Sequence, residues 1–516
     1  MATTRDAFRR PAGPDPRGAD RGHGGVHPPS ITRAADDGHH CPERARRWVL
    51  VVAVLASALG FIDSTVISIA IPAIRESLSA SLAEATWVQN AYLLALSALI
   101  LVGGAAGDRF GVRRTFVWGM VAFAVTSVLC AIAWSPAVLI GARGLKGIAA
   151  AFTVPLSLAL IAKNYPSETR GRAIGIWAAA SGVTTAIGPV AGGWLLSAGG
   201  PDAWRWIFWV NPPVAALVVW LLLRVPADRP KAGAGLDLVG AALAVLSLGA
   251  VAYGLTALGE TGGARDGAGP WIGALVLAGG AALFALFVRW EGRAPEPMVE
   301  LSLFRNRAFS GANLLTFLVY FALGGVMFFL PMTLVGGWGL SEAAVGTVFL
   351  PFTAVMAVLS GFAGDYAGKH GPRLPIAVGA ATVALAFAWL GATVGSGSLW
   401  LSIYPSMAAL GVGMGLAVSP LSTAIMGAVP DASSGEASGI NNAVSRMAGL
   451  FAVAALGVLV SVVFAGAGGP EGASFGEGAT ESGRAATVRA FAVLCYGCAA
   501  LAAAGSAVAW RTQDAR

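Results

Sequence analysis

The sequence predicts an all-α protein that crosses a membrane many times. Of its 516 residues, 56% are hydrophobic and only 12% are charged, and the mean hydropathy is +0.71. A soluble domain carries roughly twice that charged fraction. The apolar residues also form long runs, each near the length of about 20 residues that a helix needs to cross a bilayer. A chain of soluble domains, which the length alone would allow, is therefore excluded.

Fourteen apolar segments are expected to be membrane helices. They follow one another with short, mostly polar or glycine-containing joints, which is typical of antiparallel neighbours. In chain order they are 48–72, 86–107, 114–134, 137–161, 172–198, 205–224, 237–258, 271–290, 309–335, 343–366, 373–394, 399–427, 440–465 and 488–510.

Residues 1–47 are predicted to be a disordered cytoplasmic tail. They are hydrophilic and rich in Gly, Pro, Arg, Asp and His, and no apolar core follows a short basic start as in a signal peptide. A metal could be held by its histidines and cysteine, but a tail with chance histidines is the favoured interpretation, and no metal site is predicted. The residues concerned are His23, His27, His39, His40 and Cys41.

The basic residues predict which side of the membrane each loop occupies. An even number of spans places both termini on one side. If that side is the cytoplasm, the inner loops hold 15 Lys and Arg, the tail holds 9 and the outer side holds 5. Cytoplasmic loops carry such an excess. We therefore expect a multi-pass plasma-membrane protein with both termini cytoplasmic.

The first span contains the only carboxylate well inside any apolar segment, Asp63 in "FIDSTVISIAIP", Phe61 to Pro72. An ionised group at that depth is costly, so it marks a functional site by default. A carboxyl group in such a place suits a proton carrier. The alternative is a structural Asp that is hydrogen-bonded to its neighbours.

A glycine-rich joint with Asp and Arg follows the second span and recurs after the tenth. The two copies are "GGAAGDRFGVRRT", Gly103 to Thr115, and "GFAGDYAGKHGPR", Gly361 to Arg373. Gly permits close approach and positive φ, and an Asp can cap the next helix. The offset between the copies predicts two six-helix halves with two extra helices, 237–290, between them. Parallel repeats of this kind are a transporter architecture.

The fourth span, "LIGARGLKGIAAAFTVP", places Arg143 and Lys146 three residues apart on one helix face. Asp63 lies 15 residues from the cytoplasmic end of its helix and Arg143 lies 18 residues from the end of its own, or roughly 22 and 27 Å. We therefore expect Arg143 to pair with ionised Asp63 and to release it on protonation.

In the fifth span, "SGVTTAIGPVAGGW", Gly188-Pro189 is expected to kink the helix and Gly192-Gly193 to admit a close neighbour. Ordinary packing of small residues is the alternative. Polar and aromatic residues in other spans are candidates for a substrate cavity, although such aromatic residues also pack or face lipid. They are Gln89, Asn90, Asn313, Tyr320, Phe321 and Phe328.

The first glycine-rich joint resembles the loop signature of the major facilitator superfamily. The match includes Gly104, Asp108, Arg109, Gly111 and Arg113, whereas Val112 replaces a usual basic residue. The resemblance implies a conformational switch in which Asp108 pairs with the other half, and Arg109 and Arg113 complete a charge relay. The second copy keeps Asp365 but lacks the Arg after it.

The first, fourth and fifth spans resemble those of the fourteen-helix drug:proton antiporters in this superfamily. The fifth matches a G-P-x-x-G-G string linked to exporters, which supports efflux over import. In the fourth, Arg143 and Gly147 match, but Lys146 stands where Gln is usual. That lysine could extend its amine toward the interface, or it could favour an anionic or zwitterionic substrate, so the expected preference for cationic drugs stays open.

The predicted domains are the tail 1–47, a six-helix bundle 48–224, two linker helices with an inner loop 225–308, a six-helix bundle 309–510 and a cytoplasmic end 511–516. The resemblance implies a proton-coupled exporter of drugs, antibiotics or similar small amphipathic compounds. A proton-coupled importer or symporter of a metabolite is the alternative.

An enzyme is not expected, since phosphate-loop, zinc-protease and triad patterns are missing from the sequence. The expected energy source is the proton gradient, with no cofactor. The expected partners are the lipid bilayer and a small-molecule substrate, without nucleic acid, and the protein is expected to be a monomer. The C-x-x-C pair Cys495 and Cys498 lies in an apolar span and is assigned to packing in preference to redox chemistry.

Overall fold

A computed structural model describes residues 43–200, 202–225, 228, 235–259, 269–430, 433–478 and 480–513. Most of these residues lie in helices, and the described ranges contain no strand. Residues 1–42, which hold the five candidate metal ligands of the tail, lie outside this part of the chain, as do residues 514–516. The predicted domain boundaries stay predictions.

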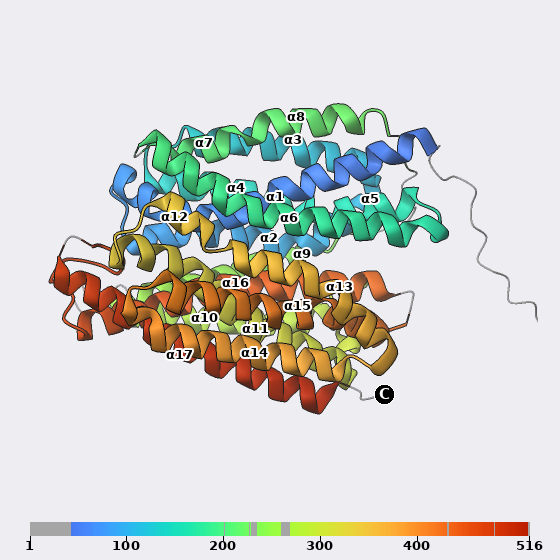
Figure 1. Ribbon diagram of the computed structural model, residues 1–516. Coiled ribbons are helices and arrows are strands. Elements are labelled where there is room, and N and C mark those ends of the chain that lie inside the picture. The colour runs from blue at the N-terminus through green and yellow to red at the C-terminus, as the bar shows by residue number, and fades with distance from the viewer. Residues whose placement is uncertain are drawn as a thin grey trace, which may run out of the picture. The chain divides into compact units, whose positions relative to one another are not determined.

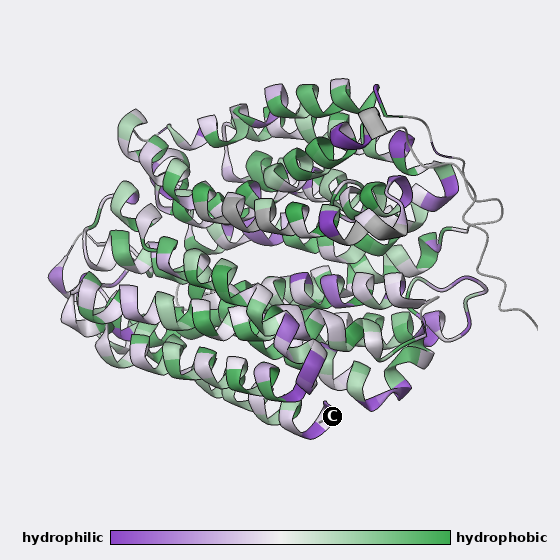
Figure 2. Ribbon diagram, turned by 45° about the vertical axis from the view of Figure 1, so that its right-hand side comes forward, coloured by the Kyte–Doolittle hydropathy of each residue, from purple (hydrophilic) through white to green (hydrophobic). Residues whose placement is uncertain are grey.

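All fourteen predicted spans coincide with helices or with consecutive helical pieces. Thirteen segments of the described chain are long and apolar enough to cross a membrane. The remaining predicted span, 172–198, falls in α6, which includes side chains outside the described set. Figure 2 shows apolar residues along the middle of the helices and hydrophilic residues mostly toward their ends.

The N-terminal half consists of six spans that run side by side (Figure 1). Two of these spans are divided into two helices each. The helices are α1 (Glu43–Leu78), α2 (Leu82–Phe110), α3 (Val112–Ala131), α4 (Pro136–Ala151), α5 (Val154–Asn164), α6 (Ser167–Gly199), α7 (Trp204–Trp209) and α8 (Asn211–Leu222).

Proline explains where the divided spans break. Pro155 stands near the start of α5 and Pro212 near the start of α8. Proline lacks an N–H and its ring clashes with the carbonyl group four residues earlier, so a helix stops shortly before it. The expected single helix over 137–161 is therefore two helices that meet at Phe152 and Thr153. By contrast, Pro189 lies inside α6, which continues through it.

Two helices, α9 (Leu238–Gly259) and α10 (Gly269–Glu291), connect the halves. They form a hairpin in which α9 packs against both α2 and α16, while α10 packs on α9. The rings of Trp87 in α2 and Tyr253 in α9 lie 6.2 Å apart. The hairpin therefore lies against both halves along α9 and is peripheral only along α10.

The C-terminal half repeats the six-span arrangement. Three of its spans include short irregular helical pieces. The elements are η2 (Leu301–Arg305), α11 (Arg307–Met332), η3 (Thr333–Gly337), α12 (Glu342–Thr347), α13 (Leu350–His370), α14 (Arg373–Thr393), η4 (Val394–Ser396), η5 (Leu399–Ile403), α15 (Tyr404–Gly427), α16 (Ser434–Gly466) and α17 (Glu481–Thr512).

The two ends of the helices differ in their connections. We call the end with the α2–α3 and α13–α14 joints the basic end, and the end with the α1–α2 and α16–α17 joints the opposite end. Gly111 and Gly371 occupy equivalent positions in the two basic-end joints and both have positive φ, 92° and 88°. A side chain is strained in that conformation, so the repeated glycine has a common structural cause.

Candidate functional site

The side chains of Asp63, Arg143 and Lys146 meet inside the N-terminal half. Asp63 comes from the middle of α1, and the two cations come from α4. One carboxylate oxygen of Asp63 accepts a hydrogen bond from Arg143 Nη1 at 2.6 Å, and the other accepts one from Lys146 Nζ. All three side chains are fully buried. We call this group the buried triad.

Further partners of Arg143 fix its orientation. Its Nε donates to the backbone oxygen of Val88 at 3.0 Å, and its Nη2 lies 3.5 Å from Gln89 Oε1. Its guanidinium carbon lies 4.3 Å from the ring centre of Tyr92. The planar group is therefore held by α2 as well as by Asp63, which suits the fixed fork of donors that Arg presents.

Aromatic rings surround the amine of Lys146. The Nζ atom lies 4.6 Å from the ring centre of Phe123 and 4.7 Å from that of Phe208. Such contacts stabilise a cation by roughly 0.5–2 kcal/mol. The amine thus points into the protein and does not extend to the membrane interface, which removes one of the alternatives raised by the sequence.

Close packing of α2 on α4 creates the geometry of the triad. A Cβ on Gly147 would lie 2.4 Å from the backbone oxygen of Tyr92, and one on Gly103 would lie 1.9 Å from that of Ala151. Only glycine allows the two backbones to approach this closely. This approach brings the backbone of α2 within hydrogen-bonding reach of Arg143.

The buried triad contains one more positive than negative group. A dry ion pair needs excellent geometry to offset the cost of removing charges from water, and here a single carboxylate serves two cations. The sequence indicated the approach of Arg143 to Asp63 from their depths, but it did not indicate that Lys146 binds the same carboxylate. The three-residue spacing in α4 was the available signal, since it places both cations on one face.

The switch residues at the basic end have partners within the N-terminal half. Asp108 receives a bond from Lys163 of α5 at 3.0 Å, and Asp228 accepts from the backbone N–H groups of Val112 and Arg113 at 2.8 and 3.0 Å. In the described part of the chain, the partner of Asp108 is thus Lys163 of the same half, and the expected pairing with the other half is not seen in this conformation.

The other charged members of the switch make weaker contacts. Arg109 lies over the ring of Phe110 at 5.5 Å, and Arg113 Nη2 donates to the backbone oxygen of Leu223 at 3.3 Å. Gly104 faces open space, and Asp365 in the second copy is exposed. The expected charge relay through Arg109 and Arg113 is thus not assembled in this conformation.

The glycines of α6 lie against two different helices. A Cβ on Gly192 would lie 2.4 Å from the side chain of Val66 in α1, and one on Gly193 would lie 2.3 Å from the backbone oxygen of Glu342 in α12. Gly188 lies near Thr65, and Pro189 lies against Gly346. The close approach expected at Gly192-Gly193 is present, and at Gly193 it joins the two halves.

Polar contacts also join the halves at the opposite end. Arg75 of α1 donates to the backbone oxygen of Phe475 at 3.0 Å, to Ser474 at 2.6 Å and to Glu477 at 2.6 Å. We call these contacts of Arg75 the end latch. Together with the packing of α6 on α12, they close the opposite end.

Near the end latch, Ser77 and Arg205 each donate a hydrogen bond to Asp202, at 2.7 and 3.2 Å. These bonds lower the pKa of Asp202. They tie the end of α1 to the α6–α7 joint within the N-terminal half.

The candidate cavity residues occupy separate places. Gln89 touches Arg143, as described above. Asn90 is fully buried, and neither polar atom of its side chain has a hydrogen-bond partner among the described residues. Asn313 accepts from Asn441 at 3.2 Å, and Phe328 is buried against Phe329. Tyr320 and Phe321 are half-buried on α11.

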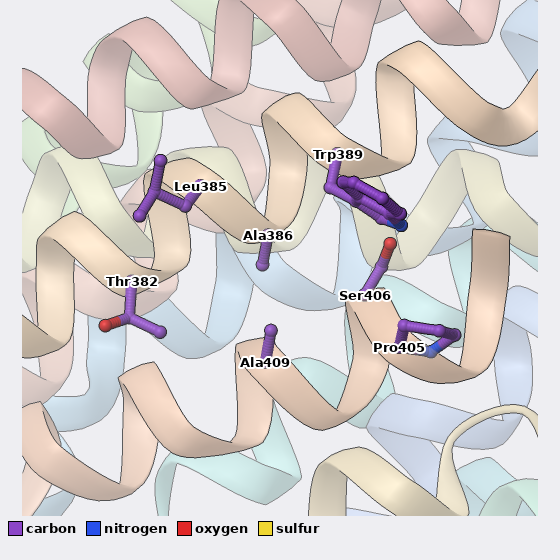
Figure 3. Close-up of a pocket in the computed structure, with 7 residues that line it drawn as sticks. All are labelled: Thr382, Leu385, Ala386, Trp389, Pro405, Ser406 and Ala409. Atoms are coloured by element: carbon purple, nitrogen blue, oxygen red, sulfur yellow. The ribbon is translucent and has the colours of Figure 1, made fainter. Parts of the chain in front are cut away.

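An apolar pocket of about 330 Å³ lies elsewhere, between α14 and α15 (Figure 3). It contains none of the candidate residues, and its lining offers no charge. The lining residues are Thr382, Leu385, Ala386, Trp389, Pro405, Ser406 and Ala409. The two cysteines Cys495 and Cys498 are buried and carry free thiols, as the packing assignment requires.

Residues 53–454 match the model of the Major Facilitator Superfamily. The tetracenomycin C resistance and export protein of Streptomyces glaucescens is 34% identical over 427 residues, which are 81% of this chain and 77% of that protein. The probable actinorhodin transporter of Streptomyces coelicolor is 32% identical over 81% of this chain and 73% of its own length. The methylenomycin A resistance protein of Bacillus subtilis is 32% identical, over 81% and 89%.

Solved structures with the same fold are more distant in sequence. A D-xylose–proton symporter aligns with a TM-score of 0.63 at 16% identity, covering 91% of this chain and 98% of its own. A bacterial homologue of the human lysosomal transporter Spinster, solved in an inward-facing and occupied conformation, aligns with a TM-score of 0.60 at 19% identity, over 91% and 98%. These two solved structures and this chain share the same arrangement of helices.

Proposed function

Since this chain belongs to the Major Facilitator Superfamily, a family of membrane transporters and not of enzymes, we propose that it is a proton-coupled exporter. Its cargo would be an antibiotic, a drug or a similar small amphipathic compound. The relatives named for resistance to, or export of, tetracenomycin C and methylenomycin A, and the one named as a probable actinorhodin transporter, support this cargo class. The observation that carries proton coupling is the buried triad.

In the proposed mechanism, Asp63 takes up the transported proton. While Asp63 is ionised, it holds Arg143 and Lys146. Among the described residues, Asp63 is the one carboxylate bonded to these two cations. Protonation removes its charge, and losing one partner of a buried ion pair costs roughly 3–5 kcal/mol. A change of this size is enough to invert a two-state population. The proton thus favours the conformation in which α1 and α4 separate or admit water and substrate.

The halves exchange access by rocking about the site between them, as in other transporters built from repeats. The two-half division at 48–224 and 309–510 belongs to this proposal, as do cytoplasmic termini and a monomeric unit. We assign the opposite end to the outside of the cell, following the positive-inside rule. The closed end latch then corresponds to a state without access from outside, and Asp108 is free to exchange Lys163 for the other half in the alternative state.

Proton release from the purified protein tests this proposal. A panel of cationic, neutral and acidic compounds is added to lightly buffered protein in detergent, and the pH change is recorded for the wild type, for Asp63→Asn and for Asp202→Asn. The last variant makes the same chemical change on the surface. We expect release with a subset of compounds in the wild type and in Asp202→Asn, and none in Asp63→Asn.

Release that persists in Asp63→Asn would assign the proton to another group. Binding without release by any compound would argue against proton antiport. Direction is tested separately in proteoliposomes with an imposed pH gradient, where uptake together with protons would support the alternative of a symporter.

A further inference from the structure

Arg446 is a cation at membrane depth in the C-terminal half. It lies 12 residues after the start of α16, which corresponds to roughly 18 Å of helix. Its side chain is half-buried, and within the described part of the chain it forms no ion pair or hydrogen bond with a carboxylate. Charged residues inside membrane proteins usually pair with each other or mark a substrate path.

The register of α16 on α2 places Arg446 between the two halves. A Cβ on Gly439 would lie 2.9 Å from Leu101, and one on Gly449 would lie 3.7 Å from Leu93. Arg446 follows Gly439 by about two helical turns and precedes Gly449 by about one. It therefore shares the face of α16 that is turned toward α2.

The register of α16 on α11 places Tyr320 at the same level. Asn441 donates to Thr316 at 2.7 Å, and a Cβ on Gly324 would lie 3.1 Å from the Cα atom of Gly449. Both contacts have the same difference in residue number between α11 and α16. Tyr320 of α11 therefore lies beside the turn of α16 that contains Arg446.

An unpartnered amide lies on the facing side. Asn90 falls one turn from Thr86 and one turn from Leu93, on the face of α2 that touches α16. Within the part of the chain that the structure describes, both its oxygen and its nitrogen are buried without a hydrogen-bond partner, although buried polar groups are nearly always hydrogen-bonded. A ligand between the halves would provide the missing partner.

Aromatic rings adjoin this position. Phe317 lies 6.0 Å from Phe321 on α11 and 6.4 Å from Phe451 on α16, measured between ring centres. Phe317 and Phe321 flank Tyr320 in sequence, and Phe451 follows Arg446 by five residues. The cluster therefore combines a cation, a phenolic hydroxyl, an amide and aromatic rings.

We propose that Arg446, with Tyr320, binds the anionic oxygen of an aromatic organic acid, a carboxylate or a phenolate, that the protein exports. This inference rests on the proposed export function and names its substrate class. The positive charge is not offset by Asp63, because that carboxylate already serves Arg143 and Lys146. An acidic substrate would therefore supply the counter-ion that Arg446 lacks, and its rings would stack on the phenylalanines.

A matched pair of probes tests whether Arg446 binds the anionic group of the substrate. We call this role of Arg446 the anchor. Binding of 1-naphthoic acid and of 1-naphthamide, which has the same shape without the charge, is measured by equilibrium dialysis at pH 7.5 with full-length protein in detergent. We expect the wild type to bind the acid at least about tenfold more tightly than the amide, as for a charge-assisted hydrogen bond. Arg446→Gln should lose this preference and Arg446→Lys should retain part of it.

Two further variants separate loss of the anchor from misfolding and from a general change of charge. Arg489→Gln removes an exposed cation from α17 and should keep the wild-type preference. Tyr320→Phe removes a single hydroxyl and should weaken binding of the acid severalfold, with binding of the amide unchanged. These variants keep the test informative even if Arg446→Gln does not fold.

The inference is overturned if the wild type does not prefer the acid, or if the preference survives in Arg446→Gln. It fails separately from the proposed function. Loss of proton release in the wild type with retained Arg446-dependent binding would refute antiport alone, whereas Asp63-dependent proton release without any preference for acids would refute the anchor alone.

Discussion

Replacing Asp63 by Asn should destabilise the protein far more than replacing Lys146 by Met. Asp63→Asn leaves Arg143 and Lys146 buried without their shared carboxylate, and removal of one partner from a buried ion pair costs roughly 3–5 kcal/mol. Lys146→Met leaves Asp63 with Arg143, whose bond of 2.6 Å is unaffected, and it removes the excess charge. The free energy of unfolding should then change by less than about 1 kcal/mol in either direction.

The double variant measures the coupling energy between Asp63 and Lys146. In Asp63→Asn with Lys146→Met, only Arg143 stays unpaired, so part of the loss should be recovered. We expect a coupling energy of about 1–3 kcal/mol, the range for residues in one ion-pair network. The assay is chemical unfolding in mixed micelles, followed by tryptophan fluorescence. Lys163→Met is the matched control, because its bonds to Asp108 and Asp228 are partly exposed and such pairs contribute about 1 kcal/mol or less.

Two results would refute this reasoning. The first is a loss in Lys146→Met as large as that in Asp63→Asn, which would mean that Lys146 is required for packing and is not a surplus charge. The second is a double variant no more stable than Asp63→Asn, which would mean that the two cations do not share their counter-ion.

Two other predictions concern the end latch and helix packing. Arg75→Gln removes the bonds to Ser474, Phe475 and Glu477. It should shift the population about 5- to 30-fold toward opening at that end, the effect of about 1–2 kcal/mol. Distances between spin labels on the α1–α2 turn and the α16–α17 joint measure this shift, and an unchanged distance distribution would contradict the prediction. Gly103→Ala should cost about 1–3 kcal/mol through overpacking against Ala151, whereas Gly104→Ala, which faces open space, should be neutral or stabilising; equal thermal stability of the two variants would contradict the packing argument.

Much of the fold follows from the sequence because a bilayer allows few solutions. In lipid, every backbone polar group must be paired within the protein, so long apolar segments become helices, and all fourteen predicted spans coincide with helical segments. The divided spans were not predicted, although the local cause, proline at 155 and 212, is present in the sequence. The sequence also predicted the glycine-rich joint and its repeat. Positive φ at Gly111 and Gly371 depends on the local backbone, so glycine at these positions is visible in the sequence.

Part of the candidate site was also accessible from the sequence. A lone carboxylate in an apolar span is costly, so Asp63 stood out, and the helical rise placed Arg143 at a comparable depth. Depth alone, however, does not say which face of a helix meets which neighbour. That is why the sequence left two roles open for Lys146, and why it did not indicate that Lys163 binds Asp108 in this conformation.

The sequence by itself thus determined the number of spans, the repeat and the identity of the costly charges, because these depend on composition and on distances along one helix. The tertiary structure alone decided that Lys146 shares the carboxylate of Asp63, that Lys163 binds Asp108 and that Arg446 has no carboxylate partner among the described residues. These pairings depend on the rotation and register of neighbouring helices, and close contacts at glycines such as Gly103 and Gly147 join helices that are distant in the chain.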